Sequence, residues 1–241
     1  MAEKANKLGP CLNSRPKEIL MKQAAVLFDL DGTLVDTAAD LIAALNLLCV
    51  EKHHPAPSQE STRPLVSDGA LGLVQHAFPK IPQEEAYLLK DRFRELYGEN
   101  ICVHSSLFPH MEELLLQLEK AHIIWGIVTN KPEHLSKLLL EKLNLYSRTA
   151  CLVGGDTTAY AKPHPRPLQY AAELLQVPVQ NCIYVGDARR DIQAGHAAGM
   201  KTIAALYGYI GVNEDPKDWH ADFSVDHASE IWSRIESWLS L

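Results

Sequence analysis

Residues 24–36 read AAVLFDLDGTLVD, a short apolar run that ends in two nearby aspartates. The run is continuously apolar rather than alternating with polar residues, which predicts a strand at 24–29 that is covered on both faces. Asp29 and Asp31 come at and just past its end, and Gly32 lets the backbone turn sharply there. Two carboxylates so placed indicate a site for a cation, although the same residue types also form ordinary solvated turns.

Further apolar runs alternate with amphipathic segments along the rest of the chain, which predicts βαβ units. The other expected strands are 123–128, 151–153, 182–186, 202–206 and 223–225. The helices expected with them are 111–120, 133–143, 167–175, 189–198 and 229–239. We therefore expect an α/β fold with a doubly wound, Rossmann-like parallel sheet. In such sheets ligands bind outside the carboxyl ends of the strands.

The interval between the first two strands breaks this alternation, because we expect only helices between residues 37 and 107. Its helical stretches are expected at 38–50, 59–78 and 83–97. They are separated by helix-breaking prolines, namely Pro55, Pro57, Pro79 and Pro82. We expect a small inserted helical cap at 37–105, within a core made of 22–36 and 106–241. Residues 1–21 are mixed polar and basic, which predicts a flexible N-terminal extension.

The composition narrows the class of protein. The chain has 241 residues, of which 46% are hydrophobic and 22% are charged, so it is long and apolar enough to fold around a core. Its net charge of −7 argues against a nucleic-acid binder. No uncharged apolar run approaches a membrane span, and five scattered cysteines indicate reduced thiols. We expect a cytoplasmic monomer or homodimer without nucleic-acid or membrane partners.

Polar side chains also follow the later expected strands. Thr129 and Asn130 follow the second strand, Lys162 lies in a proline-stiffened loop after the third, and Asp187 and Asp191 follow the fourth. Each has a structural alternative: Thr129 or Asp187 as a helix N-cap, Lys162 as a surface charge, and Asp191 as an acid that answers the helix dipole. Their occurrence in order at successive strand ends favours one joint site.

These motifs together carry a family resemblance. DLDGT at 29–33, Thr129-Asn130, Lys162-Pro163 and Gly186-Asp187 with Asp191 resemble the haloacid-dehalogenase superfamily of phosphotransferases. The match runs from Lys22 to the C-terminus, with the helical interval where that family has its cap. The chain is similar to phosphoglycolate phosphatases within it. Three stretches resemble a branch that includes N-acetylmuramic acid 6-phosphate phosphatases: VHSSLF at 103–108, WGIVTNKP at 125–132 and YGYI at 207–210.

The resemblance implies hydrolysis of a small phosphomonoester through an aspartyl-phosphate intermediate. Asp29 would be the nucleophile, and Asp31 would protonate the leaving group and then activate water. It also implies a Mg²⁺ cofactor bound by Asp29, the backbone carbonyl of Asp31 and Asp187. Asp191 would orient a metal-bound water from outside the ligand set. The phosphoryl oxygens would be held by Thr129, the amide of Asn130 and Lys162.

Two further residue patterns bear on specificity. An aspartate at position 31 favours phosphoryl transfer over dehalogenation, because a halide leaves unprotonated. Ser67, Asp68 and Gly69 form the expected specificity loop of the cap, with a helix interruption that contacts no substrate as the alternative. Ala188 stands where many relatives have a second aspartate. Alanine has no carboxylate, so it cannot form the hydrogen bond at the metal site that this aspartate would form.

Several functions remain compatible with these residues. The leading substrate is 2-phosphoglycolate, and the alternative is a sugar phosphate of cell-wall recycling, N-acetylmuramic acid 6-phosphate. A phosphomutase would use the same nucleophile, and product analysis would separate it from a phosphatase. A phosphoacceptor signalling module is the alternative from another class. Receiver domains also combine acids, threonine and lysine on a doubly wound sheet, but they have no cap between their first two strands.

Overall fold

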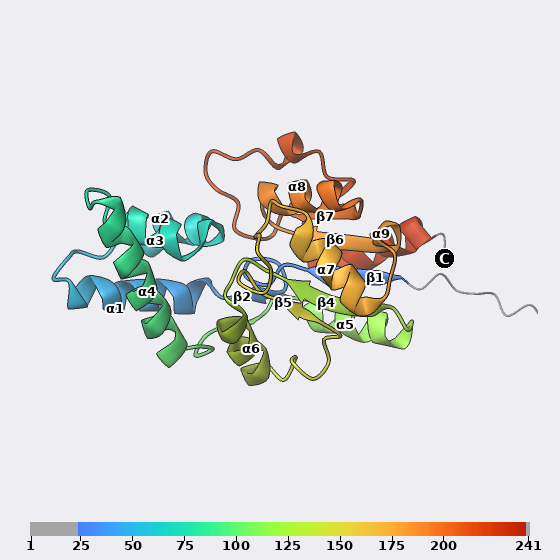
Figure 1. Cartoon of the computed structure of the whole chain (residues 1–241), viewed down its shortest axis with the longest axis horizontal. Coiled ribbons are helices and arrows are strands. Elements are labelled where there is room, and N and C mark those ends of the chain that lie inside the picture. Colours follow the sequence, from blue (N-terminus) through green and yellow to red (C-terminus); the bar gives the residue numbers. More distant parts are fainter. Residues whose placement is uncertain (1–23, 240–241) are drawn as a thin grey trace, which may run out of the picture.

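The computed structural model describes residues 24–239, so the extension expected at 1–21 lies outside the described residues. The chain forms a parallel sheet flanked by helices and, beyond one end of it, a separate group of helices (Figure 1). No helix in this part of the chain is long and apolar enough to cross a membrane. The four cysteines within the described range are free thiols.

The sheet has six parallel strands in the order β5-β4-β1-β6-β7-β8. These strands are β1 (Ala25–Phe28), β4 (Ile124–Val128), β5 (Leu152–Val153), β6 (Cys182–Gly186), β7 (Lys201–Ala205) and β8 (Phe223–Val225). Each lies where an apolar run predicts it. β1 is central, with Phe28 opposite Ile127 of β4 and Val185 of β6. The residues that follow β1, β4 and β6 therefore meet at one edge of the sheet.

Helices cover both faces of the sheet, which confirms the doubly wound fold. They are α5 (Met111–Lys120), α6 (Glu133–Lys142), α7 (Arg166–Leu175), α8 (Arg189–Ala198) and α9 (Ile231–Leu239). Side chains of β1 alternate between the faces. Val26 and Phe28 belong to the hydrophobic core with residues of α5 and α9, whereas Ala25 and Leu27 pack with residues of α7 and α8.

The helical cap lies between β1 and β4 in the sequence. It contains α1 (Ala38–Glu51), α2 (Gln59–Thr62), the 3₁₀ helix η1 (Arg63–Asp68), α3 (Gly69–Ala77) and α4 (Gln83–Glu99). α4 packs against α1 and α3, around buried side chains such as Leu45, Leu73 and Phe93. Figure 1 shows this group at the end of the molecule away from the C-terminus.

The single helical stretch expected at 59–78 is wrong, because the structure divides it into α2, η1 and α3. Pro64 lies at the start of η1 and has no backbone N–H to continue an α-helix. Gly69 adopts a φ of 75°, which redirects the chain into α3. The interruption places η1 at the edge of the cap that faces the sheet.

The expectation that residues 37–107 contain only helices is also wrong. β2 (Val35–Asp36) pairs antiparallel with β3 (Ser106–Leu107) where the chain enters and leaves the cap. Strands of two residues carry no periodic pattern, so the sequence offers no signal for them. The buried carboxylate of Asp40 adds to this connection by accepting hydrogen bonds from the backbone amides of His104 and Ser105, both at 2.9 Å.

The entrance to the cap is also bound to the core by Tyr209. Its hydroxyl accepts hydrogen bonds from the amides of Thr37 and Ala38 and donates to Asp36 at 2.7 Å. Arg63 of the cap forms an ion pair with the same aspartate at 2.8 Å. These contacts fix the first residues of α1 against the loop that follows β7.

Candidate active site

Three aspartates converge at the carboxyl edge of the sheet. Asp29 directly follows β1, Asp187 directly follows β6, and Asp191 lies in the first turn of α8. One carboxylate oxygen of each lies within 4.8 Å of the others, and all three residues are buried. The pairing of β1 with β6 brings them together although they are far apart in sequence.

Gly32 makes room for this cluster. Its φ of 88° lies in the left-handed region that disfavours side chains. A Cβ atom at this position would also collide with Oδ2 of Asp187. The glycine of the DLDGT motif is therefore required both by the turn and by the close approach of a buried carboxylate.

Asp187 is held by hydrogen bonds from three directions. Its Oδ2 accepts from the Ser67 hydroxyl and from the Tyr209 amide, both at 2.8 Å, and its Oδ1 accepts from the Thr33 hydroxyl at 3.2 Å. Burial raises the pKa of Asp187, and the charges of Asp29 and Asp191 raise it further. The N-cap of α8 is Ala188, so the alternative in which Asp187 caps this helix is wrong.

Asp191 is joined to the start of α8 and to a buried lysine. Its Oδ2 accepts a hydrogen bond from the Ala188 amide at 3.0 Å, so the backbone at this position supplies a donor. Its Oδ1 lies 2.7 Å from Nζ of Lys162. Burial raises the pKa of Asp191, while Lys162 acts in the opposite direction.

Lys162 is a buried member of the site, so the interpretation of it as a surface charge is wrong. Its side chain is 0% exposed, and Nζ lies 2.9 Å from Oδ1 of Asp29. Nζ also donates to the Tyr184 hydroxyl at 2.7 Å. The Asn130 side chain fixes the loop by donating to the backbone carbonyl of Lys162 and accepting from its amide, both at 2.9 Å. This reciprocal pair gives the Asn130 side chain a role that sequence reasoning missed.

Asp31 faces the cap rather than the other acids. Its Oδ1 accepts from the Thr37 hydroxyl at 2.7 Å and from Nζ of Lys131 at 3.0 Å. Nζ of Lys131 also donates to the Tyr97 hydroxyl of α4 at 3.0 Å. Burial alone would lower the pKa of Lys131, but the Asp31 carboxylate and Tyr97 raise it to about 12.

Sequence reasoning missed both Lys131 and Tyr97. Lys131 directly follows Thr129-Asn130, so its position at a strand end was a usable signal. Tyr97 lies in the cap, and only the packing of α4 brings it to the site. Burial raises the pKa of Tyr97 to about 12, so its hydroxyl stays protonated and can accept from the lysine while keeping its own proton.

Thr129 is buried at the end of β4 and lines the cavity in front of Asp29. Its hydroxyl accepts from the Lys131 amide at 3.3 Å. The N-cap of α6 is Pro132, so the alternative in which Thr129 caps that helix is wrong. The threonine therefore belongs to the cavity wall rather than to a helix end.

The loop that contains Ser67, Asp68 and Gly69 reaches the core from the cap. Ser67 contacts Asp187, and its backbone carbonyl accepts a hydrogen bond from Arg190 of α8. Ser67 and Gly69 line the cavity with Asp29, whereas Asp68 lines a neighbouring one. A Cβ atom on Gly69 would meet nothing within 4 Å, so its positive φ rather than close approach explains the glycine.

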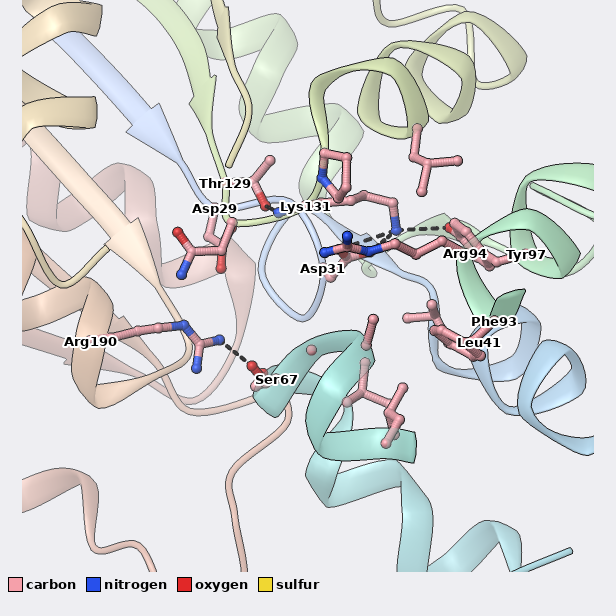
Figure 2. Close-up of a pocket in the computed structure, with 17 residues that line it drawn as sticks. Asp29, Asp31, Leu41, Ser67, Phe93, Arg94, Tyr97, Thr129, Lys131 and Arg190 are labelled. Atoms are coloured by element: carbon pink, nitrogen blue, oxygen red, sulfur yellow. Dashed lines mark hydrogen bonds and ion pairs between the residues drawn. The ribbon is translucent and has the colours of Figure 1, made fainter. Parts of the chain in front are cut away.

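A cavity of about 90 Å³ separates these groups from the cap. Figure 2 shows Asp29, Thr129 and Arg190 on one side of it and Phe93, Arg94 and Tyr97 on the other. Its cap side is mainly apolar and includes Leu41, Val66, Ala70, Leu73 and Phe93. The site thus combines a polar end at the sheet with an apolar enclosure.

The donor set of the acid cluster fits a divalent cation. Lys162 reaches Asp29 and Asp191, whereas the hydrogen bonds to Asp187 come from neutral donors. Three buried carboxylates outnumber the two cations near them, Lys162 and Arg190, and a hard cation would neutralise the remaining negative charge.

Comparisons with known proteins agree with this geometry. Residues 26–205 match the family described as haloacid dehalogenase-like hydrolase. The chain is 43% identical over 208 residues to a phosphoglycolate phosphatase of Xanthomonas campestris pv. campestris, covering 86% of this chain and 94% of that protein. It is 40% identical over 218 residues to an N-acetylmuramic acid 6-phosphate phosphatase of Pseudomonas putida, covering 90% and 98%.

A solved structure supports the fold over nearly the same range. The crystal structure titled a predicted phosphoglycolate phosphatase from Haemophilus somnus 129PT superposes with a TM-score of 0.80 at 27% identity. The superposition covers 89% of this chain and 99% of that one, so it includes both the sheet and the cap helices.

Proposed function

We propose, from the premise that this chain belongs to the haloacid dehalogenase-like hydrolase family, that it hydrolyses a small phosphomonoester at the Asp29 cluster. The family resemblance expected from the motifs is confirmed. The chain is accordingly a phosphoric monoester hydrolase. The observation that carries the proposal is the buried Asp29 carboxylate, which lies beside Lys162 and two further acids and lines a cavity enclosed by the cap.

Asp29 is proposed as the nucleophile. Its Oδ1 accepts from the Leu30 amide at 2.8 Å and pairs with Lys162, so the side chain is held in one orientation. Its carboxylate would attack phosphorus, forming an aspartyl-phosphate as the bond from phosphorus to the leaving oxygen breaks. Water would then attack that phosphorus, releasing inorganic phosphate and restoring the carboxylate.

Asp31 is proposed to transfer the protons in both steps. It would protonate the leaving alkoxide first and then accept a proton from the attacking water. Thr37 and Lys131 hold its carboxyl group at the cap side of the cavity, where a leaving group would lie. The pairing of Asp31 with Lys131, and of Asp29 with Lys162, supports different roles for the two aspartates.

Phosphoryl oxygens are proposed to bind at the sheet end of the cavity. Thr129 and Asn130 line it, and Nζ of Lys162 lies 2.9 Å from Oδ1 of Asp29. Preorganised donors of this kind stabilise charge that spreads over the phosphoryl oxygens in the transition state. The Asn130 pair with the Lys162 backbone keeps the two loops at a constant separation.

Mg²⁺ is proposed as the cofactor. Asp29, Asp187 and the backbone carbonyl of Asp31 would hold it, with Asp191 fixing its surroundings from outside the ligand set. When bound, the ion supplies positive charge that offsets repulsion between the carboxylate nucleophile and an anionic substrate. The buried excess of acid at this cluster supports the assignment.

The cap is proposed to span residues 37–105 and to contact the leaving group. A closed cap excludes water, which strengthens the electrostatic interactions inside the cavity. The contact between Ser67 and Asp187 links the expected specificity loop directly to the acid cluster. We propose that this loop, Ser67 to Gly69, helps to select the substrate.

The substrate is proposed to be 2-phosphoglycolate, the compound named for the Xanthomonas campestris relative. N-acetylmuramic acid 6-phosphate is the second candidate, supported by the Pseudomonas putida relative of similar identity. We propose that the enzyme is cytoplasmic and that its substrate is a small carbohydrate-type metabolite. Measuring kcat/KM across phosphomonoesters that include both compounds, with inorganic phosphate as the product followed, would test the proposal and exclude a phosphomutase.

A further inference from the structure

Arg94 is a cation of the cap that lines the cavity and has no role in the chemistry described above. It lies in α4, and Figure 2 shows its side chain extending from that helix into the space between cap and core. The side chain is 35% exposed, so it is neither a surface residue free in solvent nor a core residue.

The other cations that line this cavity already have close partners. Lys131 is paired with Asp31 at 3.0 Å, and Arg190 donates to the carbonyl of Ser67. Arg94 differs, because its buried Nε has no hydrogen-bond partner among residues 24–239. Its Nη1 forms a long ion pair of 3.6 Å with Asp91, whose own side chain is 65% exposed.

A buried donor without a partner requires an explanation, since such groups are rare in folded proteins. The guanidinium is planar and presents parallel N–H donors, which match the two oxygens of a carboxylate. Apolar neighbours that line the same cavity, such as Leu41, Phe93 and Leu135, reduce screening by water and strengthen such a pair. An anionic group on a ligand in this cavity would supply the partner that Nε lacks among the described residues.

The cavity already has a separate place for phosphate. Thr129 and Asp29 lie on the sheet side of the cavity, whereas Arg94 comes from the cap on the opposite side (Figure 2). An anion bound by Arg94 would thus belong to the leaving group. A carboxylate is the anion that both candidate substrates carry in addition to phosphate.

We propose that Arg94 binds a carboxylate of the leaving group and makes the enzyme selective for phosphomonoesters that carry one. This inference rests on the proposed function and adds the residue that determines its substrate class. Arg94 is assigned to specificity, while the bond-breaking steps remain with Asp29 and Asp31.

Matched substrate pairs test the proposal. 2-Phosphoglycolate is compared with 2-hydroxyethyl phosphate, and N-acetylmuramic acid 6-phosphate with N-acetylglucosamine 6-phosphate, because each pair differs in the carboxylate-bearing group. The quantity measured is the ratio of kcat/KM within a pair. The wild-type enzyme should prefer the carboxylate-bearing substrate in at least one pair. Arg94→Ala should reduce that ratio of kcat/KM values about 10- to 100-fold, the range for a charge-assisted hydrogen bond.

Two further variants sharpen this comparison. Arg94→Lys retains the charge but loses the planar fork, so it should keep part of the preference. Arg92→Ala is the matched control, because Arg92 lies on the same helix and is paired with Glu51 at 2.7 Å outside the cavity. It should keep the wild-type ratio. Thermal unfolding of each variant shows that the fold is retained.

Three results would overturn the inference. The first is a wild type that prefers neither carboxylate-bearing substrate. The second is an Arg94→Ala variant that keeps the wild-type ratio with kcat/KM unchanged for both members of a pair. The third is a variant that keeps this ratio because kcat/KM falls equally for both members. Failure of the proposed function looks different, because wild type would then hydrolyse none of these phosphomonoesters and no p-nitrophenyl phosphate.

Discussion

Nζ of Lys131 lies 3.0 Å from Oδ1 of Asp31 and so joins the proposed proton donor to the loop after β4. The same Nζ donates to Tyr97 of the cap, so this lysine links the loop that contains Asp31 to helix α4 of the cap. Asp29, only two residues before Asp31, is paired instead with Lys162. The two aspartates of one motif are therefore paired with different lysines, one in the loop after β4 and one in the loop after β5.

Asp29→Asn should lower kcat for p-nitrophenyl phosphate by at least about 10³-fold, because an amide is a far weaker nucleophile than a carboxylate. The fold should survive, since the side chains have the same shape. Steady-state kinetics and thermal unfolding measure the two effects. Asp218→Asn, at an exposed position, is the control and should retain full activity. Metal-dependent turnover near the wild-type rate in Asp29→Asn would contradict the mechanism.

Asp31→Asn should slow hydrolysis to an extent that depends on the leaving group of the substrate. An alkyl phosphate releases a basic alkoxide that needs a proton, so its kcat should fall about 10²- to 10⁴-fold. p-Nitrophenyl phosphate releases a stable phenolate, and its first step should be affected less. Burst kinetics separate formation of the phosphoenzyme from its hydrolysis. Equal losses in the first step for both substrates would show that Asp31 is not the general acid.

Removing divalent cations should abolish activity, and Mg²⁺ should restore it. Binding only to the folded state should also stabilise the protein by about 2.7 kcal/mol when the ion is at 100 times its dissociation constant. Thermal unfolding with and without Mg²⁺ measures this change. Asp187→Asn removes one of the clustered carboxylates and should lose most of the Mg²⁺-dependent stabilisation. An unchanged shift in that variant would place the ion elsewhere.

The raised pKa values of Lys131, which lies beside the Asp31 carboxylate, and of the buried Tyr97 predict a loss of stability at high pH. The pKa of each residue is raised to about 12 in the folded protein, so each loses its proton more readily when the chain is unfolded. Their contribution to the free energy of unfolding is fully present below the pKa values of the unfolded chain. It decreases as pH rises from about 10 to 12. For Lys131 the free energy of unfolding should fall by about 2 kcal/mol over this range.

Urea unfolding between pH 9 and 12 measures this dependence. Lys131→Met should weaken the fall in the free energy of unfolding over that range, relative to wild type. Lys137→Met is the control, because Lys137 is half-exposed and its ion pair with Glu141 is 3.9 Å long. Identical slopes for wild type and Lys131→Met would contradict the assigned contact.

The sheet was predictable because its strands are continuous apolar runs that end in polar residues. Asp29, Thr129, Lys162 and Asp187 follow strands or their connecting loops, and parallel pairing brings such ends to one edge. The helices of the core were predictable from their amphipathic patterns. The short pairing of β2 with β3 was not, because it depends on Val35 meeting Leu107 across the whole cap.

The sequence alone determined the fold class, the order of the motifs and the chemistry that their residue types allow. Those properties depend on local patterns, such as apolar runs, turns and the spacing of carboxylates. Tertiary structure decided which groups touch: Lys131 with Asp31, Asn130 with the Lys162 backbone, and Ser67 with Asp187. It also placed Arg94 at the cavity with no hydrogen-bond partner for Nε among residues 24–239. Such contacts join residues distant in the chain, and only the packing of cap on core sets their distances.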